Sequence, residues 1–286
     1  MSRPMLSKAL LRLSRESGLH PTCFTLSGVQ KVGQQVAGGG YGDIWKGVVG
    51  GQTVAVKSMR IFQDVEVKAA LKGFGREAVI WCQLSHPNLV PFFGLYYLDT
   101  RLCLVSPWME NGHLLDFLRK APSDINYVSI ILDVAMGLEH LHSKDVVHGD
   151  LKGTNILVTP SNRACIADFG LSSIAGVMSL QFTHSTPRLQ GGTARYQAPE
   201  LLLGQRSIHF GSDVYAFACV CYEILTGTAP FFELTNDAAV IMKVIEGHRP
   251  SRPATGLEDD LWKLIEDCWR QEPDQRPTVT EIIQRL

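Results

Sequence analysis

Apolar and polar residues alternate between residues 31 and 58 with the two-residue period of β-strands. Two glycines, Gly50 and Gly51, interrupt the alternation and supply a tight hairpin turn. The pattern therefore predicts strands at Ile44–Val49 and Gln52–Ser58. The same criteria predict two later strands, at Leu89–Leu95 and Leu102–Ser106.

Helical spacing dominates from about residue 109 onward. Residues 128–142 carry the longest apolar stripe, and an earlier helix is predicted at residues 68–84, among the strands. A strand-rich first third and a helix-rich remainder predict an α+β chain in two lobes. Four more helices are expected, at Asp213–Thr226, Ala238–Glu246, Asp259–Gln271 and Val279–Leu286.

Composition narrows the class of protein. The 286 residues suffice for one two-lobed domain, and 45% of them are hydrophobic, as in a globular protein with a sizeable core. A formal net charge of −1 gives no long-range attraction to nucleic acid or an anionic membrane, so neither is expected as a partner. No apolar run is long enough to cross a membrane. Seven scattered cysteines, without Cys-x-x-Cys spacing, predict free thiols in a reducing, cytoplasmic setting.

The first twenty residues carry four basic residues, one acidic residue and apolar residues at helical spacing. A mitochondrial targeting segment has this character, and so does an amphipathic helix that packs on the following domain. We expect the second. Residues 1–30 are then an N-terminal extension, and residues 31–286 are the main domain.

A glycine-rich segment joins the first two predicted strands. Glycines there let the backbone approach a triphosphate and direct N–H groups at it, although most glycine-rich hairpins are simply turns. The segment reads Val36, Ala37, Gly38, Gly39, Gly40, Tyr41, Gly42, Asp43, Ile44.

Two charged residues are placed where they could meet. Ala55 and Lys57 share one face of the strand 52–58, where a small residue and an ammonium could cover an adenine and reach its phosphates. A solvent-facing lysine is the commoner alternative. Glu77 lies on the apolar side of the helix predicted at 68–84, and a carboxylate there needs a partner. Lys57 is the candidate, and a solvated glutamate is the alternative.

The densest chemical signal lies at the mouth of one predicted hairpin. Strands at 156–159 and 164–167 bring Asp150 and Asn155 near Asp168, with Lys152 two residues after Asp150. Phosphoryl transfer requires oxygen ligands for Mg²⁺, a carboxylate to accept the hydroxyl proton and a cation for the transferring phosphate. A polar loop at a hairpin mouth does not by itself call for this combination.

Taken in order, these motifs resemble the eukaryotic protein kinase family over residues 31–286. The resemblance implies an N-lobe at about 31–108 and a C-lobe at about 109–286. It implies ATP as cofactor with Mg²⁺, or Mn²⁺ in its place, and protein substrates. By resemblance, Lys57 pairs with Glu77 and the α/β-phosphates. Asp150 is by resemblance the catalytic base, and Lys152 contacts the γ-phosphate. Asn155 and Asp168 would hold the metal.

The resemblance also assigns the rest of the site. Asp213 becomes an anchor in a central helix, and Arg276 the salt-bridge partner of Glu200. Trp81, Phe92, His148 and Phe169 align with the family's regulatory spine. The expected nucleotide site comprises Val36, Ala37, Gly38, Gly39, Gly40, Tyr41, Gly42, Ile44, Ala55, Lys57, Ser106, Pro107, Trp108, Met109, Leu157 and Asp168.

Three residues depart from the family pattern. Ala37 replaces the usual first loop glycine, and Ser106 is a small gatekeeper that should leave a back pocket open. Gly149 replaces the arginine that usually precedes the catalytic aspartate. The common phosphate-sensing switch is therefore in doubt, and activity is expected not to depend on phosphorylation of the activation segment.

Two features resemble serine/threonine kinases: Lys152 and the segment Gly192–Glu200. Two others resemble the tyrosine-kinase-like group: His86–Val90 and Cys268-Trp269. We expect a tyrosine-kinase-like serine/threonine kinase of signal transduction, a monomer by default. Dual-specificity or tyrosine activity is the near alternative. A pseudokinase scaffold is the alternative from another class, but its usual mark, loss of Lys57, Asp150 or Asp168, is absent.

Overall fold

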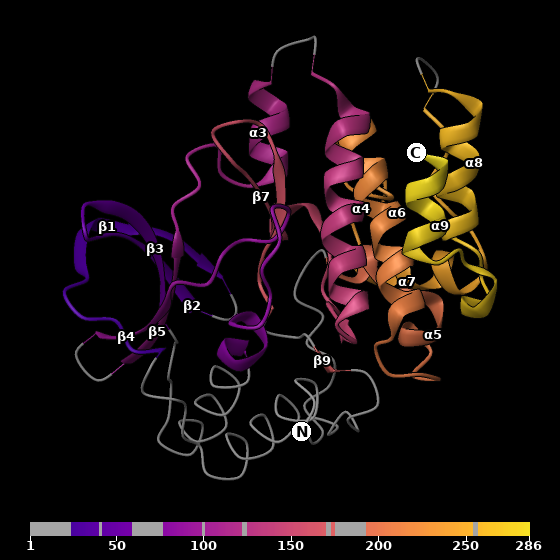
Figure 1. The fold of residues 1–286 in the computed structure, drawn as a ribbon. Helices are drawn as coiled ribbons and strands as arrows, with labels where there is room; N and C mark the ends of the chain where they lie inside the picture. The colour runs from indigo at the N-terminus through magenta and orange to yellow at the C-terminus, as the bar shows by residue number, and fades with distance from the viewer. Residues whose placement is uncertain are drawn as a thin grey trace. The chain divides into compact units, whose positions relative to one another are not determined.

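The computed structural model of the chain describes residues 24–39, 42–58, 77–98, 101–121, 125–169, 173–174, 193–253 and 257–286. The chain divides after Glu110 into two compact units (Figure 1). The first is built on strands and the second mainly on helices, which confirms the α+β class and the two lobes. The helix predicted within residues 1–20 lies outside the described residues.

The first unit contains a five-stranded antiparallel sheet with the strand order β1-β2-β3-β5-β4. Gly50 and Gly51 turn the β2–β3 hairpin with φ of 56° and 80°, a left-handed conformation that costs glycine little. The predicted hairpin is therefore confirmed. The strands are β1 Gln30–Gly39, β2 Gly42–Val49, β3 Gln52–Ser58, β4 Gly94–Leu98 and β5 Arg101–Pro107.

The strand predicted at Leu89–Leu95 is wrong for its first five residues, because β4 begins only at Gly94. Pro91 has no N–H to donate to a neighbouring strand. The carbonyl of Val90 accepts a hydrogen bond from the indole Nε1 of Trp81, at 2.6 Å. The backbone at this point is thus bound to a helical side chain and does not extend the sheet.

The two faces of the sheet differ in character. Val54 and Val56 lie in an apolar cluster with Val29, Cys103 and Val105. Lys57 and Ala55 alternate with these valines and are half-buried on the opposite face. The alternation predicted for this strand is therefore present.

The second unit is organised around α6 (Phe210–Thr226), whose residues 212–224 are all buried. It packs against α4 (Tyr127–Ser143) and α8 (Asp259–Cys268), and α4 packs against α9 (Val279–Arg285) (Figure 1). A helix that is apolar nearly all round belongs in a core, and α6 has that position. The shorter helices are α3 Leu114–Lys120, α5 Pro199–Leu202 and α7 Asp237–Ile245.

Short strands and 3₁₀ turns connect the helices of this unit. Two-stranded pairs form from β7 (Ile156–Val158) with β8 (Ala164–Ile166), and from β6 (Val146–Val147) with β9 (Ser173–Ile174). The 3₁₀ turns are η2 Gly153–Asn155, η3 Thr193–Tyr196 and η4 Pro273–Gln275.

The helix predicted at 259–271 ends early, at Cys268. The carbonyls of Arg270 and Gln271 accept hydrogen bonds from the guanidinium of Arg276, at 2.9 and 3.1 Å. These carbonyls are turned toward a side chain instead of along a helix axis, so the guanidinium of a residue five to six positions later sets the end of α8.

The six cysteines within the described ranges are free thiols, as expected. Burial raises the pKa of Cys165 to about 11 and that of Cys219 to about 12, so both stay protonated near neutral pH. None of the helices in the described part of the chain is long and apolar enough to cross a membrane.

Candidate active site

The predicted ion pair between Lys57 and Glu77 is present. Nζ of Lys57 lies 3.1 Å from Oε1 of Glu77, and the glutamate side chain is only 3% exposed. Glu77 begins the described part of a helix that runs to Trp81, and Lys57 is on the half-buried face of β3. Each charge thus has the partner that burial demands.

Strand register places other expected nucleotide residues on the same face as Lys57. Ile44 on β2 is directly opposite Lys57, and Ser106 on β5 is directly opposite Ala55. Directly paired residues on antiparallel strands project to the same side of the sheet. This face therefore brings together Lys57, the apolar Ile44 and Ala55, and the small gatekeeper candidate Ser106.

The structure describes the backbone of the glycine-rich hairpin up to Gly39 and again from Gly42 onward. Gly38 pairs with Asp43 and Gly39 with Gly42, while Gly40 and Tyr41 lie outside the described residues. Ahead of this paired stretch, Val36 is 54% exposed. An exposed apolar residue beside a glycine turn is free to cover a flat ligand.

Pro107, the last residue of β5, and the two residues after it have few backbone groups that could bind a ligand. Pro107 has no N–H, so only its carbonyl can bind a ligand. The N–H of Trp108 donates to the carbonyl of Thr53 at 3.2 Å. Of these residues, Met109 supplies the N–H expected to meet an adenine.

In the second unit, Asp150 is buried and held from two sides. Its Oδ2 accepts hydrogen bonds from Nζ of Lys152 at 2.7 Å and from Nδ2 of Asn155 at 3.0 Å. The same amide nitrogen also donates to the carbonyl of Asp150, at 2.8 Å. Lys152 reaches onward to Oγ1 of Thr193, at 3.3 Å.

The backbone before Asp150 is fixed by Asp213 of α6. Its two carboxylate oxygens accept from the N–H groups of His148 and Gly149, at 2.8 and 2.9 Å. Gly149 has a φ of 81°, in the left-handed region that favours glycine. The local backbone conformation thus gives a physical reason for glycine where the family usually has arginine.

The ring of His148 has its tautomer set by its neighbours. Nδ1 accepts from the N–H of Asp150 at 3.2 Å, so Nε2 carries the proton toward the carbonyl of Ala167, 3.0 Å away. The ring of Phe169 is fully buried and lies edge-on to His148, with centroids 5.7 Å apart.

The β7–β8 hairpin brings Asn155 and Asp168 together as predicted. The N–H of Ala167 donates to the carbonyl of Asn155 at 2.8 Å, so Asp168 follows directly after this pairing. Asp168 has a φ of 65°, a conformation that aspartate adopts more readily than most residues and that concentrates at functional sites. Leu157, half-buried on β7, pairs with Cys165.

The sequence analysis did not predict a buried glutamate that lies beside the loop carrying Asp150. Glu223 of α6 accepts from the N–H of Gly153 at 2.9 Å and from the hydroxyl of Tyr196. A Cβ on Gly153 would lie 2.6 Å from Oε2 of Glu223, so this carboxylate requires glycine there. An acid within the apolar run 214–224 was the available signal, since such an acid must have partners.

The environment of Glu223 is unusual for a carboxylate. Burial raises the pKa of Glu223 to about 7, although hydrogen bonds from Tyr196 and Gly153 favour the charged form. Burial also raises the pKa of Tyr196, which therefore remains a hydrogen-bond donor. The pKa of Glu223 thus lies near neutral pH, and this carboxyl is beside the loop that carries Asp150.

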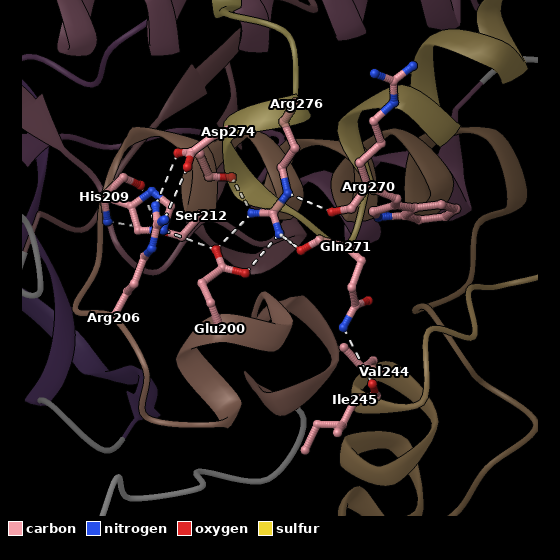
Figure 2. A network of polar contacts seen from close by, with 12 residues as sticks. Glu200, Arg206, His209, Ser212, Val244, Ile245, Arg270, Gln271, Asp274 and Arg276 are labelled. Carbon is pink, nitrogen blue, oxygen red and sulfur yellow. Dashed lines mark hydrogen bonds and ion pairs between the residues drawn. The ribbon is translucent and has the colours of Figure 1, made fainter.

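The predicted pair of Glu200 and Arg276 forms a bidentate salt bridge with two distances of 2.8 Å (Figure 2). The other three guanidinium N–H groups donate to the carbonyls of Gly211, Arg270 and Gln271. All five donors of a fully buried arginine are therefore satisfied. Although burial opposes its ionisation, hydrogen bonds from His209 and Arg276 lower the pKa of Glu200 to about 2.

Comparison with known proteins agrees with this arrangement. The family described as protein tyrosine and serine/threonine kinase matches residues 30–286. Serine/threonine-protein kinase STY17 of Arabidopsis thaliana is 34% identical over 263 residues, which cover 90% of this chain and 44% of that protein. Serine/threonine/tyrosine-protein kinase HT1 of the same plant is 31% identical, over 88% of this chain and 64% of its own length.

A fungal protein is also similar: MAP kinase kinase kinase wis4 of Schizosaccharomyces pombe is 28% identical over 88% of this chain and 19% of its own length. The chain thus spans less than two thirds of each of these relatives. Their names agree with the predicted resemblance to serine/threonine kinases of the tyrosine-kinase-like group.

Replacing Arg276 by lysine should destabilise the second unit by about 2 to 4 kcal/mol, because an ammonium cannot make the bidentate contact and leaves Glu200 buried and poorly paired. Urea denaturation followed by circular dichroism would measure this. Arg206→Lys is the matched control, since that arginine pairs with the exposed Asp274 in the same network (Figure 2). Equal losses in the two variants would contradict the assignment.

Stability should depend on pH through Glu223. The folded state raises the pKa of Glu223 from 4.5 to about 7, so protonation of this carboxyl favours the folded state. This stabilisation is complete below about pH 4.5 and is lost as the pH rises through 7. Glutamine can accept from Gly153 and donate to Tyr196 at any pH. Between about pH 5 and pH 8, the wild type should therefore lose about 2 to 3 kcal/mol relative to Glu223→Gln.

Denaturation curves at several pH values would measure this difference, with the exposed Glu246→Gln as control. Glu200 does not interfere, since its lowered pKa affects stability only below about pH 4.5. A constant difference between wild type and Glu223→Gln across the range would show that Glu223 does not titrate there.

Proposed function

Since the chain belongs to the protein tyrosine and serine/threonine kinase family, we propose that it is a protein kinase that transfers the γ-phosphate of ATP to serine and threonine hydroxyls of proteins. The observation that carries this proposal is the setting of Asp150. Its carboxylate is held by Lys152 and Asn155, and the backbone before it is fixed by Asp213. Such fixed placement is what a positioned base requires.

In this proposal, Asp150 accepts the proton of the acceptor hydroxyl as the hydroxyl oxygen attacks the γ-phosphorus. The bond from that phosphorus to the β,γ-bridging oxygen breaks, and ADP leaves. Lys152, 2.7 Å from Asp150, contacts the transferring phosphate and offsets its charge. The bond from Lys152 to Thr193 links the catalytic loop to the segment that precedes Glu200. This link supports a role for Thr193 in presenting the acceptor beside the base.

The donor set fits a hard divalent cation. Because Nδ2 of Asn155 is committed to Asp150, its amide oxygen is the atom left to ligate. Asp168 offers carboxylate oxygens directly after the pairing of Ala167 with Asn155. Mg²⁺ or Mn²⁺, bound through such oxygens, would neutralise phosphate charge.

Residues of the first unit are proposed to hold the nucleotide. Lys57, fixed by Glu77, would bind the α- and β-phosphates. Ile44 and Ala55 on the same face would cover the adenine, and the Pro107 carbonyl and Met109 N–H would meet its edge. The glycine-rich segment from Val36 to Gly42 would bind phosphate through its N–H groups, and Trp108 and Leu157 stay proposed contacts of the nucleotide.

Dual specificity is the second candidate, favoured by one observation: the similar HT1 is named a serine/threonine/tyrosine-protein kinase. The pseudokinase alternative is opposed by the presence and pairing of Lys57 and Asp150. We also propose a reducing, cytoplasmic setting, supported by the free thiols of the six described cysteines. A monomeric state remains a proposal.

Asp150→Ala should reduce kcat by about three orders of magnitude or more, because it removes the proposed base, and Asp168→Asn should do the same, because it removes a proposed metal ligand. ATP binding should survive better in Asp150→Ala, since that carboxylate addresses the acceptor. A radiolabelled phosphotransfer assay with calorimetry for ATP would measure both effects. Asp116→Ala, on the exposed side of α3, is the control. Near-normal turnover in Asp150→Ala would contradict the assignment of Asp150 as the catalytic base.

Ser106 should determine sensitivity to bulky inhibitors. Methionine at this position would fill the space beside Ala55, so aryl-substituted adenine analogues should bind about 2 to 4 kcal/mol more weakly to Ser106→Met. ATP affinity should change little. Titration of both proteins with one such compound is the measurement, with Ser106→Ala as control. Equal affinity in all three proteins would place the gatekeeper elsewhere.

A further inference from the structure

At one edge of the sheet in the first unit, β4 is covered by residues that precede the family match. The match begins at residue 30, and β4 is the outermost strand on its side of the sheet. Thr25 forms a parallel bridge with Leu95, and the N–H of Leu26 donates to the carbonyl of Leu95 at 2.7 Å. Residues 24–29, here called the edge segment, thus add a short parallel partner to β4.

The approach of this segment is closer than an ordinary side chain would allow. A Cβ on Gly94 would lie 2.5 Å from the carbonyl oxygen of Phe24 and 2.8 Å from Cγ of Leu26. Gly94 also has a φ of 152°, which side-chain-bearing residues rarely adopt. Glycine at the start of β4 is therefore explained by the contact with the edge segment.

The C-terminal end of the edge segment is part of the core. Val29 is buried in the cluster with Val54 and Val105, and Leu26 packs against that cluster. Burial of these side chains holds the segment in place, beyond what one backbone hydrogen bond would provide.

The N-terminal end of the edge segment is linked, through the ring of Phe92, to the helix that carries Glu77. The ring of Phe24 lies edge-on to Phe92, with centroids 6.1 Å apart, and Phe92 lies 5.3 Å from Trp81. Trp81 is four residues after Glu77, on the same side of one helical turn. Phe24 is thus connected through two aromatic rings to the helix whose Glu77 pairs with Lys57.

We propose that Phe24 is a positioning residue for the phosphotransfer site: it supports Phe92 and Trp81 and so keeps Glu77 within reach of Lys57. The inference rests on the proposed function for its effect on turnover, but not for its effect on the helix. Without the Phe24 ring, Phe92 loses its outer support, and the helix gains freedom to shift Glu77 away from Lys57. Lys57 would then hold the phosphates less well.

The test compares Phe24→Ala with Phe93→Ala in the full chain. Phe93 is the matched control, because it is the same residue type beside Phe92 but is 38% exposed. Phe24→Tyr keeps the ring and should behave as the wild type. Hydrogen exchange of the amides in residues 78–84 and steady-state kinetics are measured for all four proteins.

Phe24→Ala should lower kcat by about three- to tenfold, the effect of losing one aromatic contact, and leave KM for the protein substrate unchanged. Exchange should become faster at residues 78–84 and stay unchanged in β5. Phe93→Ala should change neither.

Three results would overturn the inference. Phe24→Ala could match Phe93→Ala in both measurements. It could accelerate exchange equally in β5, which would mark Phe24 as a general stabilising residue. It could accelerate exchange at 78–84 without lowering kcat. Absence of phosphotransfer in the wild type would instead refute the proposed function, while the exchange data would still decide whether Phe24 supports the helix.

Discussion

The carboxylate of Asp213 fixes the backbone before Asp150, and the geometry of the candidate site in the second unit follows from that contact. It is buried and accepts from two successive backbone N–H groups, those of His148 and Gly149, while Nε2 of His142 lies 3.0 Å from it. Backbone donors in a core must be paired, and here no strand or helix of the described chain pairs with them. The side chain of Asp213 therefore decides where the chain turns before Asp150.

The same helix fixes the loop a second time. Asp213 lies in the first turn of α6, and Glu223 lies near its last turn, where it accepts from the N–H of Gly153. The loop is thus held at residues 148–149 and again at 153. Asp150 and Lys152 lie between these two points, so a rigid buried helix places both side chains. Tyr196, also bound to Glu223, ties the segment before Glu200 to the same helix.

Much of this could be predicted from the sequence, and the exceptions share a cause. Gly50 and Gly51 act locally, so their hairpin was predictable, and the pairs of Lys57 with Glu77 and Glu200 with Arg276 followed from motif resemblance. The early end of α8 depends on Arg276 capturing two carbonyls, and the late start of β4 depends on Trp81 capturing another. Glu223 was missed because its partners come from segments 27 and 70 residues away. Local periodicity carries no record of side-chain contacts made outside a helix or strand, whether the partner is a few residues or many residues away.

The edge segment has a consequence for how this domain could be passed between proteins by gene fusion. Recombination that carried only residues 30–286 behind a foreign leader would leave the outer side of β4 bare. An uncovered strand edge is a template for strands of other chains, and Gly94 has no side chain to obstruct them. The transplanted domain would tend to aggregate while keeping all of its candidate site residues. In this protein, a portable unit therefore includes residues 24–29, which lie upstream of residue 30, where the family match begins.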